Sequence, residues 1–109
     1  MTMESQSRVV GQARIDLPLD RLAELCRRYR VRRLALFGSV LRDDFRPESD
    51  VDILVEFEPG ATPGLAFFGM EIELSELLGR RVDLNTPAGF GPALRARVLA
   101  EALPIYVAA

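Results

Sequence analysis

The sequence has no histidine and no lysine, since all 14 basic residues are arginine, and Cys26 is its single cysteine. These absences exclude zinc sites built on histidine and cysteine, Ser-His-Asp triads, lysine Schiff bases, the lysine of a P-loop and intrachain disulfides. Any chemistry must therefore be carried by carboxylates, hydroxyls and arginines. Such a set suits metal-assisted phosphoryl or nucleotidyl transfer.

The chain also lacks an apolar run long enough to span a membrane, and its first seven residues do not form a signal-peptide core. We therefore expect a cytoplasmic protein with no membrane association. The net charge of −2 argues against direct nucleic-acid binding, which normally leaves a basic surface. A length of 109 residues with 49% hydrophobic residues predicts one globular domain. We expect residues 1–16 to be an N-terminal tail and residues 17–109 to form the domain.

Two acidic residues open the second of two apolar runs in the middle of the chain, where the sequence reads Asp50-Val51-Asp52. Side chains on a strand alternate faces, so Asp50 and Asp52 point the same way, about 7 Å apart. Two ionised carboxylates at this distance repel by roughly 2 kcal/mol at an effective dielectric near 20. A hard divalent cation such as Mg²⁺ would reverse the sign of that energy. The alternative is a solvated strand end that binds nothing.

The first apolar run, residues 34–37, ends in Gly38-Ser39. A glycine lets the backbone approach a ligand closely, and the residues that follow resemble the first turn of a helix, whose free N–H groups favour anions. Arg42 is the nearest cation to such an anion by sequence. A structural ion pair of Arg42 with Asp44 or Asp50 is the competing interpretation.

Hydrophobic periodicity predicts an α/β domain with a small mixed β-sheet backed by helices. The third strand places Asp83 opposite two apolar neighbours, so Asp83 becomes a third carboxylate of the cluster if that strand lies beside Asp50-Val51-Asp52.

In the last helix we expect Leu94, Val98 and Leu99 to face inward and Arg95, Arg97 and Glu101 to face outward. The predicted helices cover 18–29, 65–78 and 92–102, with a short helical turn at 40–44; the predicted strands cover 33–37, 50–57 and 80–85, and 104–107 is either a fourth strand or a docked end.

Residues 34–55 resemble the signature of the minimal nucleotidyltransferases, small stand-alone members of the polymerase beta superfamily. The likeness covers residues 17–107 and includes the passages 55–60, 77–84 and 97–102. It implies that Gly38 and Ser39 contact the nucleotide triphosphate, and we expect Arg42 and Ser49 to bind it as well. The resemblance also implies that Asp50, Asp52 and Asp83 are the catalytic residues and hold two Mg²⁺ ions, with Asp83 helping to activate the acceptor hydroxyl.

One departure from the family pattern is Asp43, where family members often have glycine. Aspartate tolerates a left-handed backbone better than most residues, so the turn can survive, although the extra charge could weaken nucleotide binding. The role of Asn85 is not apparent from the sequence.

The resemblance implies an ATP-dependent protein adenylyltransferase. An acceptor hydroxyl would attack the α-phosphorus of ATP and pyrophosphate would leave. The implied partner is a HEPN-type toxin encoded nearby, neutralised in some pairs by adenylylation of a tyrosine, which makes this chain an antitoxin. Two alternatives are an antitoxin that acts by binding alone and a transferase acting on a small molecule, and a homo-oligomer is also compatible with the sequence.

Overall fold

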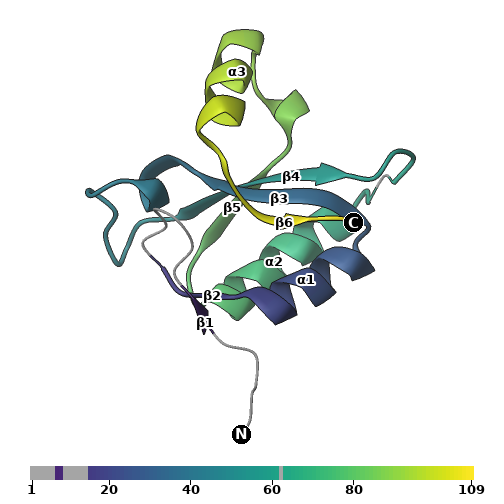
Figure 1. The fold of residues 1–109 in the computed structure, drawn as a ribbon, viewed down its shortest axis with the longest axis horizontal. Helices are drawn as coiled ribbons and strands as arrows, with labels where there is room; N and C mark the ends of the chain where they lie inside the picture. Colours follow the sequence, from purple (N-terminus) through teal and green to yellow (C-terminus); the bar gives the residue numbers. More distant parts are fainter. Residues whose placement is uncertain (1–6, 9–14, 62) are drawn as a thin grey trace, which may run out of the picture.

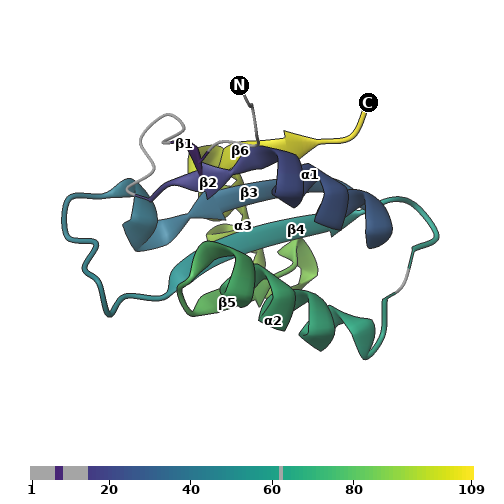
Figure 2. The same ribbon diagram turned by 90° about the horizontal axis from the view of Figure 1, so that it is seen from below.

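A mixed four-stranded sheet forms the centre of the protein in the computed structural model, which describes residues 7–8, 15–61 and 63–109. The strand order is β5-β4-β3-β6, and β3 pairs antiparallel with both β4 and β6 while β4 and β5 are parallel. Helices α1 and α2 lie side by side on one face of the sheet, and α3 stands on the other (Figure 1 and Figure 2). The strands are β3 (Val31–Phe37), β4 (Val51–Phe57), β5 (Val82–Asn85) and β6 (Leu103–Val107), and the helices are α1 (Leu19–Arg28), α2 (Ala66–Leu78) and α3 (Pro92–Glu101).

The predicted α/β class and the mixed sheet backed by helices are therefore confirmed. The end of the chain is a strand, β6, and not merely a docked segment. Gly79 ends α2 with a left-handed φ of 67°, the usual conformation of a glycine that terminates a helix. The predicted helical turn is a 3₁₀ turn, η1 (Gly38–Leu41), which begins earlier than expected, and a second one, η2 (Pro87–Gly89), precedes α3.

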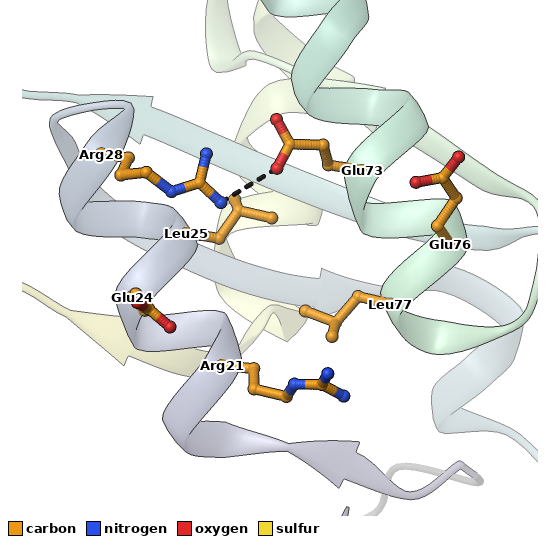
Figure 3. Close-up of a pocket in the computed structure, with 7 residues that line it drawn as sticks. All are labelled: Arg21, Glu24, Leu25, Arg28, Glu73, Glu76 and Leu77. Carbon is orange, nitrogen blue, oxygen red and sulfur yellow. Dashed lines mark hydrogen bonds and ion pairs between the residues drawn. The ribbon is translucent and has the colours of Figure 1, made fainter.

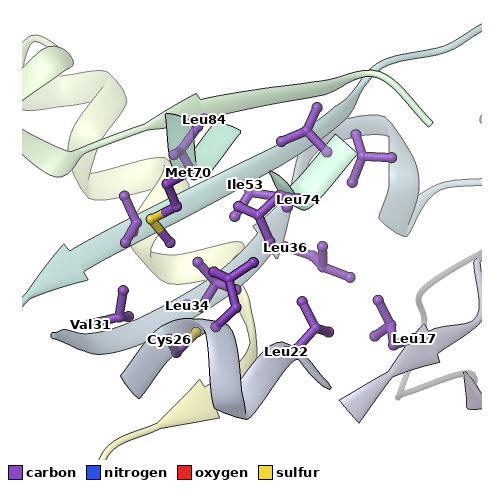
Figure 4. Close-up of a cluster of buried hydrophobic side chains, with 14 of the residues drawn as sticks. Leu17, Leu22, Cys26, Val31, Leu34, Leu36, Ile53, Met70, Leu74 and Leu84 are labelled. Atoms are coloured by element: carbon purple, nitrogen blue, oxygen red, sulfur yellow. The ribbon is translucent and has the colours of Figure 1, made fainter. Parts of the chain in front are cut away.

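The main hydrophobic core lies between the sheet and the pair α1 and α2 (Figure 4). Alternate residues of the central strands face it, so Leu34 and Leu36 of β3 and Ile53 of β4 are fully buried. Leu22 and Leu74 enter it from the two helices. A second, smaller cluster of Phe37, Leu54 and Val98 lies on the opposite face, beneath α3.

Segment 1–16, expected to be a tail, is described only in part, because 1–6 and 9–14 lie outside the described residues. In the part that is described, β1 (Ser7–Arg8) pairs antiparallel with β2 (Leu17–Pro18), and Ile15 is buried in the main core. The start of the domain thus receives backbone and side-chain contacts from before residue 17.

The arginine-rich end of α1 is tied to acidic residues of neighbouring elements. Arg28 pairs with Glu73 of α2 at 2.9 Å, and the Tyr29 hydroxyl donates to the same carboxylate at 2.5 Å. Arg28 and Glu73 line a pocket of about 330 Å³ between the two helices, and Figure 3 shows the contact between them. Arg32 and Arg33 both pair with Glu56. These ion pairs connect the end of α1 to α2 and the start of β3 to β4.

Helix α3 differs from the prediction. Val98 is its buried residue, whereas Leu94 and Leu99, expected to face inward, are 46% and 37% exposed. Arg95, expected outward, is half-buried and donates to the carbonyl oxygens of Pro87 and Phe90. The helix therefore rests on the sheet through one apolar side chain. Across the described part of the chain, no helix has the length and apolarity to cross a membrane.

Candidate active site

Asp52 of β4 and Asp83 of β5 are directly paired in the parallel register. Their neighbours Val51, Val82 and Leu84 are buried in the main core, so the alternation of the strands turns both carboxylates to the other face of the sheet. The sheet thus brings two of the three predicted acids together, as the sequence pattern required if these strands were adjacent.

Asp50 lies just before β4, and its carboxylate accepts a hydrogen bond from Nε of Arg81 at 2.7 Å. Within the ranges 15–61 and 63–109, no three acidic, cysteine or histidine side chains converge closely enough to enclose an ion. In this structure Asp50 is therefore paired with Arg81 and does not converge with Asp52 and Asp83 on one ion-sized site. The Arg81 and Asp50 side chains are both open to solvent, and ion pairs of that kind are weak, so Asp50 can leave Arg81 at little cost.

The environment of Asp52 is unfavourable for a negative charge. Partial burial, followed by the charges of Asp83 and Asp50, raises the pKa of the Asp52 carboxyl from its ordinary value of 3.8 to about 6, while Arg42 opposes the shift and Glu101 adds to it. The same surroundings favour a cation. Carboxylate oxygens are the ligands that Mg²⁺ prefers, so the donor set at Asp52 and Asp83 fits a magnesium ion.

Gly38 forms the wall of the site opposite Asp52. Its φ is +78°, and a Cβ built on it would overlap Oδ2 of Asp52 and lie 3.3 Å from its Cγ. Phe37, the preceding residue, is the register partner of Asp52, which explains why the backbone and the carboxylate are so close. Only glycine leaves room for the carboxylate here. Ser39 follows in η1 and is half-buried beside this wall.

Glu101, at the end of α3, is exposed as expected, and its carboxylate also takes part in the site. Its carboxylate accepts the backbone N–H of Gly38 at 3.2 Å and lies 3.5 Å from Nη1 of Arg42. The ion-pair partner of Arg42 is thus Glu101, and neither of the aspartates Asp44 and Asp50 that the sequence suggested. A signal for this position exists, because Val98 and Glu101 are three residues apart and so share a helix face.

Ser49 and Asp43 occupy the loop that leads to Asp50. The Ser49 hydroxyl accepts the backbone N–H of Arg46 at 3.1 Å and closes a turn with it. Asp43 does not adopt the left-handed conformation considered for it, since Arg30 is the one non-glycine residue with a positive φ in the described part of the chain. The loop therefore does not depend on a glycine at this position.

Two further polar side chains fix the short edge strand β5, and sequence reasoning did not find either role. The Asn85 amide donates to the carbonyl of Asp83 at 3.0 Å. Glu71 of α2 accepts the backbone N–H of Leu84 at 2.8 Å. Both contacts hold the backbone on which the Asp83 carboxylate is mounted.

Sequence comparison gives consistent similarities. The nucleotidyltransferase domain family matches residues 20–106 of the chain. The protein adenylyltransferase MntA of Thermococcus cleftensis is 41% identical over 85 residues, which are 77% of this chain and 82% of the relative. A protein of Methanocaldococcus jannaschii, provisionally named a protein adenylyltransferase, is 40% identical over 75 residues, which are 69% of this chain and 80% of the relative.

Solved structures with the same arrangement include one provisionally described as a minimal nucleotidyltransferase, which is 42% identical with a TM-score of 0.68 and covers 79% of this chain and 87% of its own. A toxin–antitoxin crystal structure with AMP-PNP has a TM-score of 0.67 at 21% identity and covers 84% of this chain and 75% of its own. A complex of a tri-AMPylated Shewanella oneidensis HEPN toxin with an MNT antitoxin has a TM-score of 0.59 at 21% identity and covers 83% and 70%. At 21% identity, the two toxin–antitoxin structures show that this chain has the same fold as they do.

Proposed function

The chain belongs to the nucleotidyltransferase domain family, and from this premise we propose that it is a Mg²⁺-dependent protein adenylyltransferase acting on a HEPN-type toxin. The acceptor would be a tyrosine hydroxyl of that toxin, and the chain would be the antitoxin of the pair. The observation that carries the proposal is the pairing of Asp52 with Asp83 opposite the backbone of Gly38.

Asp52 and Asp83, joined by Asp50 once it leaves Arg81, are the residues that would hold two Mg²⁺ ions. When bound, such ions activate the attacking hydroxyl and neutralise charge on the leaving oxygen. The raised pKa of Asp52 supports this assignment, because a bound cation offsets the repulsion from Asp83 and Asp50.

The groups facing these acids suit the triphosphate. The Gly38 N–H and the Arg42 guanidinium already converge on a carboxylate, so both are placed to donate to anionic oxygens. Ser39 and Ser49 would complete the binding of the phosphates. The acceptor oxygen forms its bond to the α-phosphorus as the bond to the β-phosphate oxygen breaks, pyrophosphate leaves, and Asp83 receives the hydroxyl proton.

A macromolecular acceptor is consistent with the shape of the site. Asp83 is exposed on an edge strand of the sheet, so a side chain presented by another protein can reach it. The relatives named as protein adenylyltransferases support a protein acceptor, and the HEPN toxin complexes with the same fold support the class of partner.

The test is incubation of the protein with Mg²⁺, ATP and the HEPN-type protein encoded beside it. The intact mass of the partner should increase by one or more adenylyl groups, located on tyrosine by peptide mapping. Asp52→Asn should abolish the increase, whereas Asp16→Asn, at an exposed aspartate outside the site, should retain it. An unmodified partner after incubation with wild type would contradict the proposal.

Neutralisation by binding alone is a second candidate, favoured by the engagement of Asp50 with Arg81. In that case Asp52→Asn would still protect cells from the partner, and wild type would add no adenylyl group. Loss of protection by a variant that still binds the partner would exclude it.

A further inference from the structure

The carboxylate of Glu101 is placed between two hydrogen-bond donors from a distant part of the chain. The Gly38 N–H donates to Oε2 at 3.2 Å, and Nη1 of Arg42 lies 3.5 Å from Oε1. Gly38 and Arg42 belong to the turn after β3, whereas Glu101 is the last residue of α3. An anionic side chain of the protein thus occupies a two-donor anion site.

A phosphate group would use the same donors. Carboxylate and phosphate oxygens are both strong acceptors of hydrogen bonds from guanidinium and backbone N–H groups. A backbone N–H has one hydrogen to donate, so Gly38 cannot serve Glu101 and a phosphate at full strength together. The Glu101 charge also lies near Asp52, whose pKa it helps to raise, and so adds to the negative potential that a triphosphate meets.

Resting on the function proposed above, we propose that Glu101 is an internal competitor of the nucleotide phosphates, which must displace its carboxylate from Gly38 and Arg42 before they bind. Glu101 therefore lowers the affinity for nucleotide and takes no part in the transfer itself. Glu101 therefore competes with the polyphosphate part of the nucleotide and not with its base.

The displacement needs only a local movement. The side chains of Arg42 and Glu101 are 55% and 41% exposed, and ion pairs this open to water are weak. A triphosphate carries more negative charge than one carboxylate, so it can replace Glu101 as the acceptor for both Gly38 and Arg42.

The experiment measures the affinity of ATP, tripolyphosphate and adenosine by calorimetry for wild type, Glu101→Gln and Glu101→Ala. Removing a competing surface ion pair should tighten ATP and tripolyphosphate binding about two- to five-fold. Adenosine, which has no phosphate, should bind all three proteins equally. Glu48→Gln, which removes one exposed negative charge from the loop before Asp50, is the matched control and should change affinity less than Glu101→Gln.

A second readout reports the contact directly. The Gly38 amide resonance should move in ligand-free Glu101→Ala, and tripolyphosphate should move it in wild type. An unmoved resonance in Glu101→Ala, or equal or weaker binding of ATP by both Glu101 variants, would overturn the inference. If wild type binds ATP and adenylylates its partner while the variants match it, only the role of Glu101 fails. If no protein in the set binds ATP or tripolyphosphate, the proposed function fails with it.

Discussion

The carboxylate of Asp52 occupies the space into which a side chain at Gly38 would project. The backbone of Gly38 has φ of +78°, a conformation that L-residues with a side chain rarely adopt, so two independent constraints require glycine here. The Gly38 backbone, proposed to bind phosphate, and the Asp52 carboxylate, proposed to bind metal, are therefore in direct contact.

Gly38→Ala should inactivate the protein. The new methyl group forces the Asp52 carboxylate or the η1 backbone to move, and a displacement of about 1 Å at reacting groups can cost about 100-fold in rate. Adenylylation of the partner at fixed time points measures the loss. Gly60→Ala is the matched control, because Gly60 has a similar φ of +83° but nothing within 4 Å of its Cβ position. Equal losses in the two variants would show that backbone strain, and not the overlap with Asp52, is responsible.

Asp52→Asn should stabilise the folded protein above pH 6. The folded-state pKa of Asp52 is about 6 against an ordinary 3.8, so between these values the folded chain holds a proton that the unfolded chain has released. The free energy of unfolding of wild type thus falls as pH rises through this window. Because the carboxylate is only half-buried, the gain in Asp52→Asn at pH 8 is about 1 to 2 kcal/mol, smaller than the full shift implies.

Urea denaturation at pH 4, 6 and 8 without Mg²⁺ checks this pH dependence. The difference between Asp52→Asn and wild type should be near zero at pH 4 and largest at pH 8. Asp16→Asn, at an exposed position, should show no such trend. A constant difference across the three pH values would refute the electrostatic explanation.

Glu71→Ala should loosen β5. The change leaves the Leu84 N–H without its acceptor, and an unsatisfied backbone group of this kind costs about 1 to 3 kcal/mol. Hydrogen exchange should show faster exchange at Leu84 and Asn85 than in wild type. Glu76→Ala, on an exposed position of the same helix, should leave β5 unchanged. Slow exchange retained at Leu84 in Glu71→Ala would show that the side-chain contact is dispensable.

Val98→Ala should destabilise the protein by about 1 to 2 kcal/mol, because it removes buried methyl groups from the cluster with Phe37 and Leu54. Leu94→Ala removes more carbon from the same helix at an exposed position and should cost less. Thermal unfolding of the two variants compares them directly. A larger loss in Leu94→Ala would restore the inward orientation that the periodicity of this segment suggested.

The sequence predicted the order of the main helices and strands and the face of the sheet on which Asp52 and Asp83 lie, whereas their meeting was predicted only on the condition that the two strands are neighbours. Period-2 alternation assigns a face to each strand residue, and the apolar neighbours Val51, Val82 and Leu84 left one choice for the acids. The functional roles of these residues remain predictions.

The end of α3 could not be predicted in the same way. This helix is apolar on several sides and reaches the sheet through one residue, so periodicity did not identify its buried face, and the contact of Glu101 with Gly38 was missed. The engagement of Asp50 by Arg81 depends on which strands are neighbours, information that a local pattern does not contain.

The alternation of apolar and acidic side chains along β4 and β5 also disfavours an incorrect strand register. A one-residue slip of β4 would turn Asp52 toward α1 and α2 and expose Val51 and Ile53 to water on the other side. Burying an ionised carboxylate among Leu36, Leu74 and their neighbours would make the slipped sheet far less stable than the correctly aligned one. The acids proposed for catalysis therefore also help to specify the strand register, because the incorrectly aligned sheet would bury a charged group.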